Sequence, residues 1–338
     1  MAPRILLLAD GGPEIGGGHV MRMLTLAEAL RAQGAEPVLA APVSTAEVIA
    51  AFAPAGLETR LLGSVEPEAL TEEDTAEAKA VVFDHFRLSA DHHRELAAGR
   101  PCAAVDDLAD RTMGVDLIAD PGPDRTAADY EGLSDARLLL GPDYALVRPE
   151  FAERRRVALD LRERARGAAG RILVSMGLTD VGGITRRVVE AIRPVCGEAV
   201  LDIVVGPGAP SREWLGTQAG ESLKVHAPAH DMASLSATAD LAIGAGGSSA
   251  FERCVLGLPT VLLVLADNQL PNARALERRG AAQVIDARKP GFETALADAV
   301  QTLAEDARLR GQMARAAARV CDGRGAARVA EAVLSLLR

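Results

Sequence analysis

The sequence predicts an α/β protein of two domains, each built on a doubly wound parallel sheet. Its 338 residues exceed one typical domain and suit two of roughly 150 residues each. Hydrophobic residues make up 49% and aromatic residues only 3%, so the cores consist of Ala, Val, Leu and Ile. Short aliphatic runs of this kind are typical of buried parallel strands, and here they alternate with helical patterns along the whole chain.

The first half contains one series of βα units, which we expect to form a domain over residues 1–150. A buried strand over 4–9 leads through a glycine-rich turn into an amphipathic helix over 19–33. Further strands are predicted at 36–41, 59–62, 80–84, 102–106 and 116–119, and helices at 45–53 and, strongly acidic, at 66–78. His92 and His93 lie in a charged helix, where we expect them to be solvated.

A charged helix over 151–168 with little apolar stripe then interrupts the rhythm, as a solvent-bridging connector does. The second domain, 169–338, carries predicted strands at 171–177, 200–205, 223–226, 240–244, 260–264 and 282–285. Residues 291–338 are helical with a break at 322–325, which leaves the last helix able to cross back onto the first domain. Two such domains are expected to face each other across a cleft, where ligands commonly bind.

Composition excludes several classes of protein. The formal net charge of −10 disfavours a nucleic-acid partner, because phosphates would meet net repulsion. No run approaches the roughly 20 apolar residues of a membrane span, and the apolar stretch near the N-terminus is too short for a signal peptide. The four cysteines are scattered without metal-binding spacing, as expected of reduced thiols. We therefore expect a cytoplasmic protein with a small-molecule partner.

The first motif, IGGGHVMR over 15–22, lies between the first strand and the first helix. Gly17 and Gly18 allow close approach of the backbone to a ligand, and His19 begins the helix on the carboxyl side of the sheet. We favour a catalytic His19 over a capping one. Arg22, one turn further, suits the same space or a surface salt bridge. The motif is not the G-x-G-x-x-G fingerprint, so a dinucleotide site is disfavoured. We expect no cofactor.

The second motif, IGAGGSSAFERCVLGLPTVLL over 243–263, follows a strand and opens a helix. Gly246, Gly247, Ser248 and Ser249 supply backbone N–H groups that suit a diphosphate. Glu252, one turn into the helix, suits a ribose diol. This combination predicts a nucleotide site, whereas the alternative is an ordinary turn with a surface glutamate.

Three further groups complete the candidate site. Asn268 and Gln269 suit sugar hydroxyls or a phosphate, or else cap a helix. Ser175 and Gly177 lie in the first turn of the second domain, where Thr179 and Asp180 either line the site or cap the next helix. Asp84 ends a strand, as do Asp106, Asp107 and Asp120; such carboxylates position a base or bind sugar hydroxyls. No spacing supports a metal site.

These segments, together with DYEGL (129–133) and LLLGPDYALVRPEF (138–151), resemble one family. It comprises the UDP-2,4-diacetamido-2,4,6-trideoxy-β-L-altropyranose hydrolases of pseudaminic acid biosynthesis. The similarity runs in order from about residue 4 to 276. The glycine and glutamate block is shared with GT-B glycosyltransferases of the MurG type. The resemblance implies a GT-B fold, removal of UDP by water without a metal, His19 as the catalytic residue, and Tyr144 near the cleft.

Three positions depart from that family's pattern: Leu178, Gly183 and the pair Asp120-Pro121. These loops are expected to face the cleft, so the sequence leaves the identity of the sugar open. The oligomeric state is also left open. We expect UDP in the second domain and a water molecule activated by His19 at the anomeric carbon, with inversion. The alternatives are a GT-B glycosyltransferase, a UDP-sugar 2-epimerase on the same fold, and a nucleotide-sugar-binding protein without catalysis.

Overall fold

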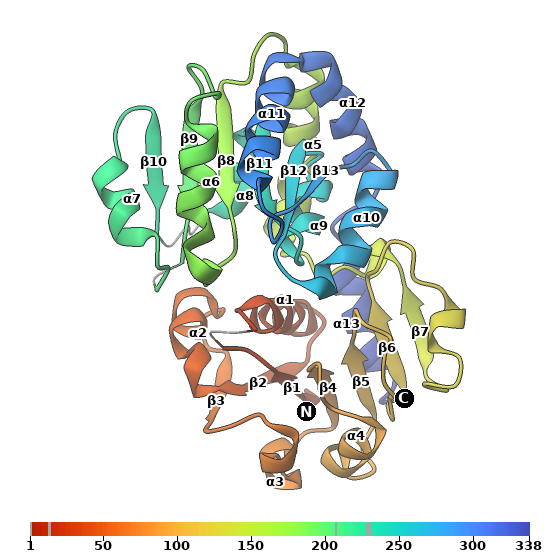
Figure 1. Ribbon diagram of the computed structural model, residues 1–338. Helices are drawn as coiled ribbons and strands as arrows, with labels where there is room; N and C mark the ends of the chain where they lie inside the picture. The colour runs from red at the N-terminus through yellow and green to blue at the C-terminus, as the bar shows by residue number, and fades with distance from the viewer. Residues whose placement is uncertain (1, 13–14, 207, 228–230) are drawn as a thin grey trace. The chain divides into compact units, whose positions relative to one another are not determined.

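A computed structural model describes residues 2–12, 15–206, 208–227 and 231–338. The chain divides into two compact units. The first consists of Met1–Val147 with Arg324–Arg338, and the second of Arg148–Gly323. Each unit contains one parallel sheet flanked by helices (Figure 1). The prediction of two doubly wound parallel sheets is therefore confirmed.

The sheet of the first unit has seven parallel strands in the order β3-β2-β1-β4-β5-β6-β7. Their bounds are β1 Arg4–Ala9, β2 Glu36–Pro42, β3 Glu58–Leu62, β4 Ala80–Asp84, β5 Cys102–Val105, β6 Leu117–Asp120 and β7 Arg137–Leu140. The order reverses between β1 and β4, so the loops after these two strands diverge at the carboxyl edge. Such a switch point is where ligands bind in sheets of this kind. Strand β7 was not predicted from the sequence.

Two helices cover one face of this sheet, and a third covers the other (Figure 1). The first pair is α1 Gly18–Ala32 and α13 Gly325–Ser335, and the opposite face carries α4 Ala90–Ala97. Short helices α2 Ala46–Phe52 and α3 Glu72–Thr75 complete the unit. The final helix thus packs on the first unit. It begins with a glycine because a Cβ at Gly325 would lie 2.2 Å from the carbonyl oxygen of Ala145.

Two predictions in this unit were wrong. Residues 66–78 form a 3₁₀ turn, Pro67–Ala69, and the single-turn α3, because extended Leu70 interrupts the backbone and Thr71 caps a new start. His93 is buried, 1% exposed, with its ring 4.9 Å from that of Phe83. Burial lowers the pKa of His93 to about 3.

The sheet of the second unit has six parallel strands in the order β10-β9-β8-β11-β12-β13. Their bounds are β8 Arg171–Ser175, β9 Val200–Val204, β10 Leu223–His226, β11 Leu241–Ala245, β12 Thr260–Val264 and β13 Gln283–Asp286. The order reverses between β8 and β11, which gives this unit a switch point of its own.

The helices of the second unit are α5 Pro149–Arg164, α6 Ile184–Ile192, α7 Arg212–Gln218, α8 Met232–Thr238, α9 Ser249–Val255, α10 Leu270–Arg278, α11 Phe292–Glu305 and α12 Ala307–Ala318. Helix α5 occupies the place of the expected solvent-bridging connector, but it is packed against other helices rather than bridging solvent. It packs against α8, α9 and α12 along a narrow buried seam of Phe151, Ala158 and Arg162. The guanidinium of Arg162 donates to the carbonyls of Ser236 and Ala237 near the end of α8, as a C-terminal cap.

All four cysteines are buried free thiols. Within the described ranges, no helix combines the length and the apolar character needed to cross a membrane.

Candidate functional site

In the first unit, His19, Arg22 and Asp84 form one buried cluster at the switch point. Asp84 is the last residue of β4, and His19 and Arg22 lie in the first turns of α1, which follows β1. The imidazole Nδ1 of His19 lies 2.5 Å from Asp84 Oδ1 and 3.2 Å from the Asp84 carbonyl oxygen. Both of these atoms are acceptors, so the ring hydrogen belongs on Nδ1. Arg22 Nη2 also lies 3.2 Å from Nδ1, but it donates to Asp84 Oδ1 at 2.6 Å. No residue in the described part of the chain bonds to Nε2, which is left to accept a proton.

Arg22 fixes the carboxylate that holds His19. Its Nε donates to Asp84 Oδ2 at 2.9 Å and its Nη2 to Oδ1 at 2.6 Å, a bidentate pair. Burial alone would raise the pKa of Asp84, but the charge of Arg22 and the ring of His19 outweigh it and lower that pKa. The rings of Phe86 and His19 meet edge to face, with their centroids 4.3 Å apart. The orientation of the imidazole is thus set from several sides.

Two carboxylates flank this cluster, and one oxygen of each accepts no hydrogen bond from the described residues. Asp107, after β5, accepts from Arg22 Nη1 at 2.8 Å through Oδ2, while its Oδ1 is buried and unpaired among the described residues. Asp10, after β1, is 1% exposed, and its Oδ2 is likewise unpaired there. Two cationic or titratable groups lie near that oxygen, His85 Nε2 at 3.5 Å and Arg87 Nη2 at 3.8 Å, but His85 Nε2 donates its hydrogen bond to the carbonyl of Val65. Both oxygens are acceptors available to a ligand's N–H or O–H groups.

In the glycine-rich turn of the first unit, Gly12 and Gly16 form an antiparallel bridge. They exchange backbone hydrogen bonds of 3.2 and 2.7 Å. Gly17 caps α1 and is buried, whereas Gly18 is exposed, and a Cβ at Gly18 would meet no other atom within 4 Å. The turn therefore delivers His19 to the carboxyl edge of the sheet.

In the second unit, the loop Gly246–Ser249 follows β11 at the switch point. Gly246 N–H donates to the carbonyl of Leu263, but the N–H groups of Gly247, Ser248 and Ser249 have no acceptor among the described residues. Three consecutive free N–H groups form a cradle that suits an anion. Ser175, at the end of β8, lies in register beside Gly244 of β11, so it ends at the same edge of the sheet.

Beneath this loop lies Arg253, a residue that was not selected from the sequence. It is 3% exposed, its Nη1 donates to Ser249 Oγ at 3.1 Å, and its Nη2 donates to the carbonyl of Ala245 at 2.7 Å. The glycine at 244 makes room for it, because a Cβ there would lie 2.5 Å from Nη1. A glycine within the buried strand that precedes the helix was the available signal.

Glu252 is bound to a residue far away in sequence. Its carboxylate receives Arg148 Nε at 2.8 Å and Nη2 at 3.2 Å, a bidentate pair across 104 residues. The carboxylate is held in one orientation and retains lone pairs for further donors.

The remaining predicted residues occupy different places. Gln269 lies against Gly246 and accepts from Leu265 N–H through Oε1 at 2.9 Å, whereas Asn268 is exposed. Gly177 is exposed in the loop after β8. Asp180 is buried, with Oδ1 accepting from Thr185 N–H at 2.8 Å at the start of α6. Tyr144 packs on the hydrophobic core of the first unit, near α13.

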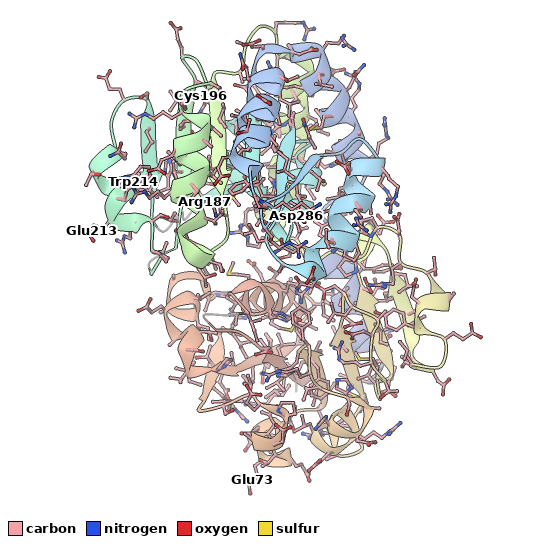
Figure 2. All side chains as sticks on the ribbon, viewed as in Figure 1. Glu73, Arg187, Cys196, Glu213, Trp214 and Asp286 are labelled. Atoms are coloured by element: carbon pink, nitrogen blue, oxygen red, sulfur yellow. The ribbon has the colours of Figure 1, made fainter. Side chains whose placement is uncertain are left out.

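A pocket of about 460 Å³ also lies on the second unit, lined by α6 and α7 residues together with Arg193 and Pro194. Trp214 of α7, labelled in Figure 2, is its aromatic wall. None of the sequence-predicted site residues lines it. Among the described residues, no group of three or more His, Cys, Asp or Glu side chains is placed to hold a metal ion.

Comparison with solved structures identifies the fold. The crystal structure of MurG from Acinetobacter baumannii matches with a TM-score of 0.67 at 18% identity, over 98% of this chain and 99% of that one. The UDP co-structure of MnaA from S. aureus matches with a TM-score of 0.65 at 15% identity, over 99% and 97%. The fold is therefore of the GT-B type. That prediction, first drawn from sequence resemblance, is confirmed.

Sequence comparison adds a family match and several relatives. The family described as Glycosyltransferase family 28 C-terminal domain matches residues 203–331. The spore coat polysaccharide biosynthesis protein SpsG of Bacillus subtilis is 27% identical over 293 residues, which cover 82% of this chain and 81% of SpsG.

Two other relatives are matched over only part of their length. An uncharacterized protein of Methanocaldococcus jannaschii is 24% identical over 274 residues, 77% of this chain and 55% of that protein. The UDP-N-acetylglucosamine–N-acetylmuramyl-(pentapeptide) pyrophosphoryl-undecaprenol N-acetylglucosamine transferase of Sorangium cellulosum is 43% identical over 113 residues, 32% of this chain and 28% of the transferase. The chain thus spans about half of the first relative and just over a quarter of the second. The comparisons thus establish the GT-B fold and a partial match to glycosyltransferase and polysaccharide biosynthesis proteins.

Proposed function

We propose that this protein is a UDP-sugar hydrolase that releases UDP from a UDP-linked di-N-acetylated trideoxy sugar in nonulosonic acid biosynthesis. The observation that carries the proposal is the buried pair of His19 and Asp84, with Nδ1 bonded at 2.5 Å and Nε2 left open. A base held in one tautomer by a carboxylate suits the activation of water.

The catalytic step follows from this tautomer. Nε2 of His19 takes a proton from a water molecule as the water oxygen attacks the anomeric carbon. The bond between that carbon and the UDP oxygen breaks, and its electron pair leaves with UDP. Asp84 stabilises the imidazolium that forms, and a single displacement inverts the anomeric configuration.

Arg22 and Asp84 take positioning roles in this proposal rather than the substrate contacts expected of them. Both are buried and bonded to each other, so neither has a face to offer a sugar. One oxygen each of Asp10 and Asp107 accepts no hydrogen bond from the described residues, and these oxygens are better suited to accept hydrogen bonds from hydroxyl or acetamido groups.

The nucleotide is assigned to the second unit. The free N–H groups of Gly247, Ser248 and Ser249 suit the diphosphate, and Glu252 suits the ribose diol. Two structural neighbours are complexes with nucleoside diphosphates, MnaA with UDP and the rhamnosyltransferase SpnG with thymidine diphosphate, and they support such a ligand.

A second candidate is a GT-B glycosyltransferase that uses an acceptor hydroxyl in place of water. The match to the glycosyltransferase family 28 C-terminal domain and the transferase of Sorangium cellulosum favour it. Both candidates share the nucleotide site and differ only in the nucleophile.

The deciding experiment is incubation with a panel of UDP-sugars in H₂¹⁸O, without an acceptor, followed by mass spectrometry and early NMR of the released sugar. A hydrolase releases UDP without acceptor, carries ¹⁸O in the sugar, and gives the inverted anomer first. Turnover that depends on an added acceptor supports the transferase. Binding without turnover supports a nucleotide-sugar-binding protein without catalysis. Label in the nucleotide contradicts attack at carbon.

A further inference from the structure

Arg253 is a buried charge that forms no ion pair with a described residue, although the neighbouring Glu252 carboxylate attracts it. It is 3% exposed, and no Asp or Glu pairs with its guanidinium in the described part of the chain. Glu252, its neighbour in sequence, is bonded to Arg148 instead. Burying an unpaired guanidinium is costly, and such charges are normally paired with a carboxylate or another anion.

Hydrogen bonding compensates this cost only in part. Nη1 donates to Ser249 Oγ and Nη2 to the carbonyl of Ala245, while Nε is buried without any partner among the described residues. Burial lowers the pKa of Arg253 to about 10, so the group is still charged at neutral pH.

The position of this charge is specific. Ala245 immediately precedes the loop Gly246–Ser249 and Ser249 is its last residue, and the guanidinium bonds to both. The free N–H groups of Gly247, Ser248 and Ser249 belong to the same short segment. A cradle of N–H donors and a guanidinium that forms no ion pair with a described residue therefore meet at one loop, and both favour an anion there.

We propose that Arg253 is a positioning residue of the diphosphate site, which fixes the loop Ala245–Ser249 and supplies the positive charge that a bound nucleoside diphosphate neutralises. This inference rests on the proposed function. The inference adds that the affinity for a nucleotide rises with its number of phosphate charges because of Arg253, although Arg253 does not touch the ligand. The same charge also stabilises UDP as it leaves.

Arg162 provides a matched control within the same unit. It is also a buried arginine, and burial lowers its pKa to about 10 as well. Its guanidinium donates to backbone carbonyls within α5 and at the end of α8, and none of these belongs to the 245–249 loop. Replacing it removes a buried guanidinium without altering that loop.

The test is calorimetric titration of uridine, UMP and UDP into the full-length protein and into Arg253→Met and Arg162→Met variants. Arg253→Met is expected to weaken UDP binding about 10- to 100-fold, UMP less, and uridine no more than about twofold. Arg162→Met is expected to change all three ligands alike. An Arg253→Met variant that loses affinity equally for uridine and UDP, or loses none, overturns the inference.

Arg253→Lys decides the question if Arg253→Met does not fold. It keeps the charge and gives up one hydrogen bond, so the preference for UDP over uridine is expected to stay within about threefold of the unsubstituted protein. A preference that collapses, with uridine binding unchanged, shows that the fork of hydrogen bonds rather than the charge matters and overturns the electrostatic role. If the unsubstituted protein binds uridine and UDP equally or not at all, the proposed function fails as well.

Discussion

Asp84 Oδ1 receives hydrogen bonds from two residues of one helix, His19 Nδ1 at 2.5 Å and Arg22 Nη2 at 2.6 Å. Arg22 holds the carboxylate and the carboxylate holds the imidazole, so the three side chains act as one unit. Because Arg22 carries a charge opposite to that of Asp84, the pair fixes the ring without leaving a net negative charge of its own beside it.

The first prediction tests this arrangement through Asp84→Asn. An amide can donate to Nδ1, which would place the ring hydrogen on Nε2 and remove the base. We expect kcat to fall on the order of 10²–10⁴-fold, as for His19→Ala, while UDP affinity measured by calorimetry barely changes. The double variant should be no worse than either single one, since groups that act together are not additive. Near-normal kcat in either single variant removes the pair from the mechanism.

The second prediction concerns Glu252. Its replacement by alanine should weaken UDP binding by about 1.5–3 kcal/mol, because a carboxylate that accepts ribose hydroxyls is lost. Calorimetry with UDP and with 2′,3′-dideoxy-UDP separates this role from a structural one, since the dideoxy ligand should bind the variant and the unsubstituted protein alike. Equal losses for both ligands would mean that Glu252 serves only to hold Arg148.

The third prediction concerns metal. In the proposed mechanism the charge on the leaving UDP is stabilised by backbone N–H groups and Arg253, so protein treated with EDTA should keep its full rate of UDP release. Steady-state rates before and after chelation, with the metal content verified, provide the measurement. Activity lost with EDTA and restored by Mg²⁺ or Mn²⁺ would give the strand-end aspartates a direct catalytic role.

The fourth prediction is a pH dependence of stability that originates at His93. The folded pKa of about 3 lies below the ordinary value near 6.5, so the unfolded chain binds more protons between these values and stability falls as pH decreases. The free energy of unfolding should fall by up to about 2 kcal/mol between pH 6.5 and 5.

Urea unfolding at several pH values measures this pH dependence of stability. His93→Gln should flatten the dependence in this range, whereas the neighbouring His92→Gln, on a partly exposed side chain, serves as the control. An unchanged slope in His93→Gln would assign the effect to other groups, with buried His85 the first candidate because burial also lowers its pKa.

Local pattern was sufficient to predict most of the strands and the two glycine-rich turns, because aliphatic runs and glycines report directly on buried strands and tight backbone. It also selected His19, Arg22 and Asp84 separately. It could not show that they bond to one another, since that depends on β1 and β4 being neighbours in the sheet. The pairing of Glu252 with Arg148 is equally non-local.

The missed elements have physical reasons. Strand β7 lies at the edge of its sheet with only Leu139 buried, and it overlaps a segment interpreted as a motif. Arg253 and His93 carry polar side chains that suggest solvent, yet each is buried because its helix turns that face inward. Charge in a sequence does not distinguish an inward-facing position from an outward one.

The return of α13 to the first unit has a consequence for synthesis on the ribosome. The second unit is continuous along the chain, from Arg148 to Gly323, so all of its parts are available as soon as it has been translated. The first unit begins earlier but finishes later, because the apolar residues of α13, among them Val329 and Val333, belong to its core. The half of the protein made first must therefore wait, with one sheet face incompletely covered, until the half made second has already emerged.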